Sequence, residues 1–225
     1  MKIYGIVGAG GFGREVLPLV EAFLKTTGQR EAKLFFVQEE QAPALLVNDY
    51  PVLSMQEFFS YPAENKYFNI AIANGEIRKR IAEQLLAKGA EAFRITALNS
   101  IELGPNHIGE GAILCPFTTI TANARIGRFF HANIYSYVAH DCIIGDYVTF
   151  APNVHCNGNV HIEDQVYVGT GVVIREGSPQ KPLLIGKGAI LGMGAVITKN
   201  VPPFETVVGN PARPMKAKES TRLTA

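Results

Sequence analysis

A histidine followed by an aspartate, in the segment SYVAHDC, is the feature of this sequence best suited to acid–base chemistry. The pair is His140 and Asp141. An imidazole titrates near neutral pH, and a carboxylate beside it raises its basicity and fixes its tautomer. Neighbouring residues of a regular strand face opposite ways, so the pairing requires a turn at this point or a contribution from another chain. The pair is a candidate general base, and an exposed histidine without chemistry is the alternative.

A glycine-rich segment, GAGGFG at residues 8–13, lies between a strand-like run and a helix-like run. Gly8, Gly10 and Gly13 match the pattern GxGxxG, which lets the backbone approach a diphosphate at a helix N-terminus. The segment predicts a nucleotide site and leaves an NAD-binding oxidoreductase as one alternative. Against NAD, the region is short, and the acidic residue expected after the second strand is only loosely present in residues 38–40.

The other histidines are weaker candidates. His155 and His161 are six residues apart, which places them on different faces of the fold described below, and we expect His107 and His131 near its corners. A zinc hydratase of the γ-carbonic anhydrase type needs three convergent histidines, and no trio has a suitable spacing. We therefore predict no metal site.

Composition bounds the class of protein. The chain has 225 residues, 47% of them hydrophobic and 18% charged, with a net charge of +1. These values exclude bulk disorder and argue against nucleic acid or an anionic membrane as the main partner. No apolar run suits a spanning helix and the N-terminus does not resemble a signal peptide, so we expect no membrane insertion. Three cysteines without a CxxC pair predict buried thiols in a reducing cytoplasm.

The first 98 residues alternate strand-like and helix-like runs, which predicts an α/β domain with a small parallel sheet covered on both faces. We expect strands at 2–7, 34–37, 68–73 and 93–97, and helices at 14–25 and 76–88.

A six-residue repeat begins after about residue 100. Ile, Leu or Val occupies nine of the twelve first positions of the hexads from Ile108 to Ile174, and small residues recur at the fifth position. Three hexads make one triangular coil of about 18 residues, with both of these positions pointing inward. The repeat predicts an all-β parallel β-helix at residues 99–205 and a C-terminal tail at 206–225, without revealing the hand of the helix. His140, at a third position, should project from the wall.

The repeat breaks at residues 176–183, EGSPQKPL, by about five residues. Such an excursion cannot fit inside the prism and must protrude. It either lines a ligand groove or is a tolerated surface insertion.

Five segments, in this order, resemble the left-handed β-helix acyltransferases, and among them the bacterial sugar acetyltransferases with a Rossmann-like N-terminal domain. The segments are GAGGFG at 8–13, IAIANGEIRKRI at 70–81, NIYSYVAHDCIIGD at 133–146, CNGNVHI at 156–162 and VVGNPAR at 207–213. That group includes sialic acid O-acetyltransferases and the UDP-4-amino-sugar N-acetyltransferases of bacillosamine biosynthesis. The resemblance implies a left-handed β-helix, acetyl-CoA as co-substrate, and a homotrimer with active sites between subunits.

The resemblance also implies roles for individual residues. His140 would be the general base, with Asp141 beside it. The sugar nucleotide would contact Gly10, Gly11, Phe12, Gln38, Glu39, Ala73 and Asn133. Acetyl-CoA would lie along the outer wall of the later coils, at Thr149, Gly158, Thr170 and Met193, with the Gly158 amide aimed at the thioester oxygen. Lys199 and Arg213 are weaker candidates for contacts to its phosphates.

Two departures from the family pattern concern the acceptor. Relatives with a known amino-sugar substrate carry His where this chain has Phe12, and two Asp where it has Gln38 and Glu39. The nucleotide base and the identity of the sugar therefore stay open.

We accordingly expect an acetyl-CoA-dependent N-acetyltransferase acting on a nucleotide-linked deoxyamino sugar for cell-surface glycan synthesis. A sugar O-acetyltransferase of the sialic acid type, an NAD-binding oxidoreductase and a non-catalytic trimeric scaffold are the alternatives. Phe129, Phe130 and Tyr135 near flat prism faces are expected to favour self-association, which would bring His140 of one chain against donor groups of another.

Overall fold

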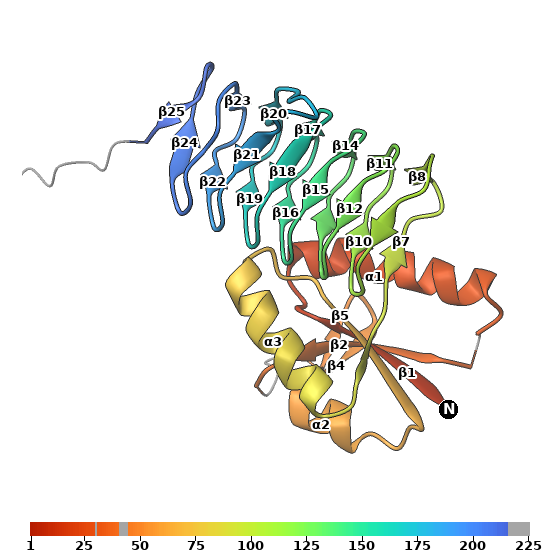
Figure 1. Ribbon diagram of the computed structural model, residues 1–225. Helices are drawn as coiled ribbons and strands as arrows, with labels where there is room; N and C mark the ends of the chain where they lie inside the picture. The colour runs from red at the N-terminus through yellow and green to blue at the C-terminus, as the bar shows by residue number, and fades with distance from the viewer. Residues whose placement is uncertain (30, 41–44, 216–225) are drawn as a thin grey trace, which may run out of the picture.

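The computed structural model describes residues 1–29, 31–40 and 45–215, and the remaining residues of the expected tail, 216–225, lie outside this description. An α/β domain at the N-terminus lies beside the first coils of a triangular prism of short strands (Figure 1). Within the described ranges, none of the helices has the length and apolar character needed to cross a membrane.

The N-terminal domain is built on a six-stranded sheet of order β3-β4-β2-β1-β5-β6, parallel except for the β3–β4 pair. Its strands are β1 (Lys2–Val7), β2 (Lys33–Gln38), β3 (Leu46–Val47), β4 (Tyr50–Ser54), β5 (Asn65–Ile70) and β6 (Glu91–Ala92). Its helices are α1 (Gly11–Thr26), α2 (Met55–Ser60) and α3 (Gly75–Ala87). The expected α/β domain is confirmed, and β3, β4 and α2 are additions that the sequence pattern did not reveal.

Helices α1 and α3 follow directly from local sequence. Val16, Leu17, Val20 and Leu24 recur at helical spacing and are buried on one face of α1. Asn74 caps α3, because its side-chain oxygen accepts a hydrogen bond of 3.0 Å from the backbone N–H of Ile77.

The prism has three faces, each a sheet of two- or three-residue strands stacked in parallel. Face 1 contains β7 (Ile95–Thr96), β10 (Ile113–Leu114), β13 (His131–Ala132), β16 (Thr149–Phe150), β19 (Tyr167–Val168), β22 (Ile190–Leu191) and β24 (Thr206–Val208), with β25 (Arg213–Pro214) added antiparallel. Face 2 contains β8 (Ile101–Glu102), β11 (Thr119–Ile120), β14 (Tyr137–Val138), β17 (His155–Cys156), β20 (Val173–Ile174) and β23 (Val196–Ile197). Face 3 contains β9 (His107–Ile108), β12 (Arg125–Ile126), β15 (Ile143–Ile144), β18 (Val160–Ile162) and β21 (Leu183–Ile185).

The six-residue repeat accounts for both the core and the corners. First- and fifth-position side chains from Ala112 to Val201 fill the prism interior, as expected. The fourth position of successive hexads has positive φ, which turns the chain from one face to the next. The non-glycine residues with this conformation in the central coils are Phe117, Asn123, Phe129, Tyr135, Asp141, Tyr147, Asn153, Asn159 and Gln165. Third- and fourth-position residues therefore lie on the prism edges, which we name 1–2, 2–3 and 3–1 after the faces they join.

Several boundaries differ from the sequence-based expectation, among them that of the strand expected at 68–73, which is β5 and ends at Ile70. The strand expected at 93–97 is divided: β6 ends the N-terminal sheet, whereas β7 pairs with β10 and begins the prism. The prism continues past residue 205, because β24 pairs with β22. At the insertion, Tyr167 pairs with Ile190, where the 18-residue step of the other coils would reach Ile185. Five extra residues are thus accommodated outside the prism, as predicted.

Arg78 of α3 joins the two domains. Its guanidinium is fully buried and donates hydrogen bonds to five carbonyl groups, those of Ile72, Ala73, Phe129, Tyr147 and Val148. Burial lowers its pKa to about 9, which leaves it charged at neutral pH. The contact fixes the loop after β5 against prism face 1.

Two of the three aromatic residues expected to favour self-association are buried within the chain. Phe130 points into the prism core, and Phe129 packs between Phe68 and Tyr147 at the contact between domains. The expectation was wrong for both, because a fifth-position side chain faces inward and the N-terminal domain covers Phe129. Tyr135 is exposed on edge 1–2, where it stacks on Phe117 with ring centroids 5.0 Å apart.

Candidate active site

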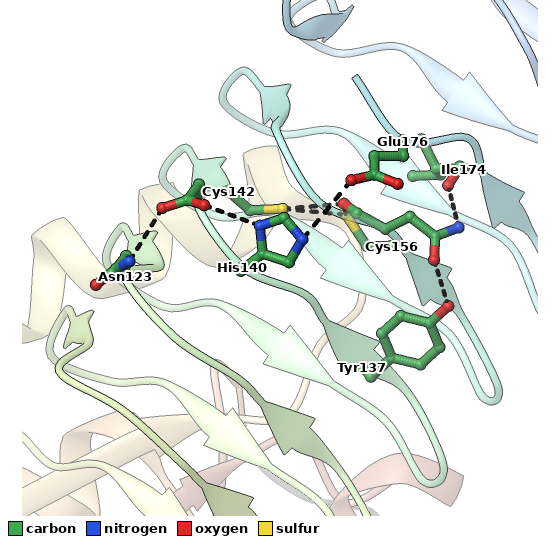
Figure 2. A network of polar contacts seen from close by, with 9 residues as sticks. Asn123, Tyr137, His140, Cys142, Cys156, Ile174 and Glu176 are labelled. Carbon is green, nitrogen blue, oxygen red and sulfur yellow. Dashed lines mark hydrogen bonds and ion pairs between the residues drawn. The ribbon is translucent and has the colours of Figure 1, made fainter. Parts of the chain in front are cut away.

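His140 and Asp141 pair within one chain on edge 2–3 (Figure 2). Nδ1 of His140 lies 2.8 Å from Oδ2 of Asp141. The pairing that a regular strand would forbid is possible because Asp141 occupies a corner position with φ of 58°. The His140 side chain is 50% exposed, so it projects from the wall as predicted.

The surroundings of the imidazole favour a proton-accepting Nε2. A hydrogen bond to Asp141 raises the pKa of His140 above its ordinary value and holds the Nδ1–H toward the carboxylate. His140 in turn lowers the pKa of Asp141, and so does Asn123, whose side-chain amide donates to Oδ1 of Asp141 at 3.1 Å. In the neutral ring Nε2 is therefore the free acceptor, and Oε1 of Glu176 lies 3.7 Å from it.

Gly158 lies directly beside the imidazole on the next coil. A β-carbon at this position would lie 2.6 Å from Nε2 of His140, so only glycine leaves room for the ring. Its carbonyl accepts a hydrogen bond of 3.0 Å from the backbone N–H of Gly177. The structure thus brings together three residues of the predicted site, His140, Asp141 and Gly158, and adds Asn123 and Glu176, which sequence reasoning missed.

A polar chain supports the peptide next to Gly158. The Tyr137 hydroxyl donates to the side-chain oxygen of Asn157 at 2.8 Å, and the Asn157 amide donates to the carbonyl of Ile174 at 2.8 Å (Figure 2). Below it, Cys142 and Cys156 are buried with their sulfur atoms 4.0 Å apart, as expected for core positions. The floor of the site is therefore fixed by side chains of neighbouring coils.

The predicted sugar-nucleotide residues of the N-terminal domain gather at the carboxyl edge of its sheet. Gly10, Gly11 and Phe12 follow β1 at the N-terminus of α1, and Gln38 and Glu39 follow at the end of β2. This edge is where ligands bind in open parallel sheets. The convergence of these segments supports a single binding site.

The open space at this edge, together with the N-terminus of α1, suits an anionic group. Added β-carbons at Gly10 and Gly11 would meet no atom within 4 Å, whereas one at Gly13 would fall on the carbonyl oxygen of Gly8. Gly13 therefore allows close packing of the helix on the strand, and Gly10 and Gly11 leave the N-terminus of α1 open to a ligand. Glu39 is engaged by Arg80, with Nη1–Oε1 at 2.6 Å and Nη2–Oε2 at 2.9 Å, which lowers the pKa of Glu39.

Ala73 borders a cavity of about 520 Å³ between the loop after β5 and face 1. Its lining residues are Ala73, Asn74, Gly75, Glu76, Gln165, Tyr167, Gly188, Ile190 and Phe204. The prism residues among them were not predicted to line a cavity. Their aromatic and aliphatic side chains at outward-facing sixth and fourth hexad positions could have indicated a covered surface.

Thr149 belongs to the contact between domains. Its side chain is almost wholly buried, and its hydroxyl donates a hydrogen bond of 2.8 Å to the carbonyl of Ala73. The expectation of an acetyl-CoA contact along an outer wall was wrong for this residue, because the loop after β5 covers its face of the prism.

His131, expected near a corner, is instead fully buried in β13, with its ring 5.3 Å from that of Phe12. Burial, together with the nearby Arg78 charge, holds the pKa of His131 well below its ordinary value. The imidazole is therefore neutral and packs against the ring of Phe12. His107 likewise lies in a strand, β9, and not at a corner.

The remaining predicted residues lie on a different edge from His140. Asn133, Thr170 and Met193 follow β13, β19 and β22 of face 1, which places them on edge 1–2. The Met193 side chain is 81% exposed. A single chain therefore does not bring these residues to the imidazole.

Lys199 and Arg213 line one cavity of about 210 Å³ near the end of the prism. In the described part of the chain, no three side chains among His, Cys, Asp and Glu gather as they would around a metal ion.

Comparisons with known proteins give one consistent result. The family model described as the PglD N-terminal domain matches residues 4–85. The chain is 54% identical over 216 residues to the GDP-perosamine N-acetyltransferase of Escherichia coli O157:H7, covering 96% of this chain and 97% of that protein. The structure of WeeI from Acinetobacter baumannii AYE superimposes with a TM-score of 0.91 at 52% identity, covering 96% of this chain and 100% of that one. The acetyltransferase domain of PglB from Neisseria gonorrhoeae FA1090, in complex with acetyl coenzyme A, gives 0.82 at 28% identity, covering 95% and 98%.

Proposed function

Because the chain belongs to the left-handed β-helix family of acetyl-CoA-dependent sugar N-acetyltransferases, we propose that its acceptor is a GDP-linked amino sugar of the perosamine type. The single observation that carries the choice of acceptor is the 54% identity to a GDP-perosamine N-acetyltransferase across nearly the full length of both proteins. Acetyl-CoA is the donor, and the product is an amide on a nucleotide-linked sugar.

The GxGxxG segment fits this assignment. The diphosphate of the sugar nucleotide lies at the N-terminus of α1, where Gly10 and Gly11 leave open space. Phe12, Gln38 and Glu39 then stand near the remainder of the nucleotide, at the carboxyl edge of the sheet. The glycine segment can thus bind the diphosphate of the sugar nucleotide, and its presence does not require NAD as a ligand.

His140 acts as the general base of the transfer. The nitrogen of the neutral sugar amine attacks the thioester carbonyl carbon and forms a C–N bond, and its extra proton passes to Nε2 of His140. Collapse of the tetrahedral intermediate breaks the C–S bond, and the imidazolium gives its proton to the leaving thiolate. Asp141 stabilises the imidazolium between these steps, and base catalysis of this kind contributes roughly 10²- to 10⁴-fold.

Gly158 places its backbone beside the reacting centre. Its amide is suited to stabilise the oxyanion of the tetrahedral intermediate, an effect worth about 3 kcal/mol for one preorganised donor. The absence of a side chain at this position also lets the thioester come close to Nε2 of His140.

A homotrimer completes the site. Asn133, Thr170 and Met193 lie on edge 1–2, whereas His140 and Gly158 lie on edge 2–3, so two neighbouring copies must pack edge to edge for these groups to meet. Exposed apolar residues on edge 1–2, including Phe117, Tyr135 and Met193, support burial there. We place the reaction in the cytoplasm, in keeping with three free and buried cysteines, and in the supply of sugars for a cell-surface glycan.

A coupled assay of CoA thiol release tests the proposal. Acetyl-CoA is presented with GDP-perosamine, with a UDP-linked amino sugar and with free sialic acid, and the product is treated with neutral hydroxylamine, which cleaves esters and spares amides. We expect turnover with GDP-perosamine and a product that resists hydroxylamine. Turnover confined to the UDP-linked sugar, or an ester on sialic acid, would overturn the assignment of the acceptor.

A further inference from the structure

Glu176 stands on the proton-accepting side of His140. Its Oε1 lies 3.7 Å from Nε2, opposite the ring nitrogen that Asp141 holds (Figure 2). This separation is too long for a direct hydrogen bond and leaves both acceptors free to face one donor group. Both side chains are about half exposed, at 50% for His140 and 58% for Glu176, so a ligand can reach them.

The insertion places the backbone of Glu176 beside the imidazole. Glu176 is the first residue of the 176–183 excursion, directly after the prism strand β20 and Arg175. The next residue, Gly177, donates its N–H to the Gly158 carbonyl at 3.0 Å, and Ser178 and Lys181 exchange two backbone hydrogen bonds that close the excursion. The loop therefore begins beside the imidazole, and the side chain of its first residue, Glu176, lies at the site.

An amine acceptor needs something that a hydroxyl acceptor does not. At neutral pH a primary amine is largely an ammonium ion, which must lose one proton before attack and a second one during it. Acetylation of an ammonium consumes R–NH₃⁺ and acetyl-CoA and yields the amide, CoA thiol and one free proton. Acetylation of a hydroxyl yields the ester and CoA thiol with no net proton. A negative charge next to the base would therefore favour binding of the ammonium form of an amine acceptor.

We propose that Glu176 binds the ammonium group of the acceptor sugar and holds it against Nε2 of His140. This inference rests on the proposed function, and it makes Glu176 the residue that selects an amine over a hydroxyl. The ammonium donates one N–H to the Glu176 carboxylate and directs another toward Nε2. The first proton passes to Nε2 and from there to solvent, which leaves the neutral amine in place for attack. The second proton follows the general-base path and ends on the CoA thiol.

Asp141 does not serve this purpose. Its carboxylate is occupied by Nδ1 of His140 and by the amide of Asn123, and it faces away from Nε2. Among the described residues, the carboxylates that lie within 4 Å of the imidazole nitrogens are those of Asp141, at 2.8 Å from Nδ1, and Glu176, at 3.7 Å from Nε2. Glu176 is thus the carboxylate available to the accepting nitrogen.

The test compares Glu176→Gln and Glu176→Asp with the wild-type enzyme and with a matched control, Glu110→Gln. Glu110 is also a carboxylate at a prism corner, but it lies on edge 3–1 and pairs with Arg128 at 2.7 Å. Calorimetry in the presence of CoA measures affinity for GDP-perosamine and for the GDP-linked sugar that carries a hydroxyl in place of the amine. Steady-state assays give KM and kcat for acetyl-CoA and for the amino sugar.

We expect Glu176→Gln to weaken binding of the amino sugar about tenfold or more and binding of the hydroxyl analogue less than about twofold. KM for acetyl-CoA stays near the wild-type value, Glu176→Asp recovers part of the loss, and Glu110→Gln behaves as wild type. Equal losses for both nucleotide sugars, or no loss for either, would overturn the role of Glu176. A wild-type enzyme that acetylates no amino sugar would instead overturn the proposed function.

Discussion

The guanidinium of Arg78, in helix α3, donates a hydrogen bond of 2.6 Å to the carbonyl of Tyr147 in the prism. The same group donates to Ile72 and Ala73 in the loop that borders the face 1 cavity. One buried cation thus connects the N-terminal domain and the loop after β5 to the β-helix. The acceptors of the guanidinium are backbone carbonyl groups, so the contact requires no acidic side chain.

Replacing Arg78 with Met should destabilise the whole chain. The substitution leaves the carbonyls of Ile72, Phe129 and Tyr147 without a donor, whereas those of Ala73 and Val148 still accept from Thr149 and from the backbone N–H of His131. Unsatisfied buried groups cost roughly 1–3 kcal/mol each, so we expect a loss of at least about 3 kcal/mol. Chemical denaturation measures the free energy of unfolding. Lys79→Met is the control on the same helix, because Lys79 is exposed and should change the free energy by less than about 0.5 kcal/mol. Similar values for the two variants would contradict the role given to Arg78.

The glycines of the GxGxxG segment should separate into a structural one and a binding one. Gly13→Ala forces a β-carbon onto the carbonyl of Gly8 and should cost about 1–3 kcal/mol of stability or prevent folding. Gly11→Ala meets no atom and begins a helix, so the free energy of unfolding should stay equal or rise slightly.

With Gly11→Ala we expect KM for the nucleotide sugar to rise about tenfold, since a methyl group now stands where the diphosphate approaches. KM for acetyl-CoA should remain unchanged. An unaltered KM for the nucleotide sugar would place the diphosphate elsewhere.

Asp141→Asn tests the tautomer of the base. Asn tolerates the positive φ of this corner, so the turn survives. Its amide can donate to Nδ1 of His140, which would leave the ring proton on Nε2 and remove the acceptor; we expect kcat to fall roughly 10²- to 10⁴-fold.

The same variant should alter the pH profile of kcat/KM. Asp141 raises the pKa of His140, and the base works only when neutral, so wild-type activity rises as the pH passes through this raised pKa. Without the carboxylate the rise of the residual activity should move to lower pH. Asn123→Ala, which removes one hydrogen bond to Asp141, serves as the control and should cost less than about tenfold. A rise at unchanged pH in Asp141→Asn would assign the titration to another group.

The hexad pattern was sufficient to predict the prism and the outward direction of His140. A strict period leaves one arrangement in which all large first-position residues share a core, and the third position then has to lie on an edge. The pattern did not reveal that the N-terminal domain covers Phe129 and Thr149 on the outer surface of the prism. The covering residues lie far away in the chain, in the loop after β5 and in α3.

Glu176 and Asn123 were missed for a related reason. Asn123 precedes Asp141 by 18 residues, and Glu176 belongs to an excursion with no period. Only the stacking of successive coils brings both residues to the ring. Arg78 was equally hidden, since an arginine in a helix is normally expected to be exposed and the carbonyls that it contacts are distant in the sequence. By contrast, the Gly8, Gly10 and Gly13 spacing correctly placed a turn between strand and helix, because that geometry is local.

The most direct test of the account is the effect of His140→Ala on catalysis and on binding, measured together with acetyl-CoA and GDP-perosamine. The side chain is half exposed and its ring belongs to no hydrophobic core, so the free energy of unfolding should change by less than about 0.5 kcal/mol. The affinity for both substrates should stay within about threefold of wild type. We predict that kcat falls roughly 10²- to 10⁴-fold, the contribution of a positioned general base. A variant that retains kcat within tenfold of wild type would show that another group removes the proton, and the account of this site would be wrong.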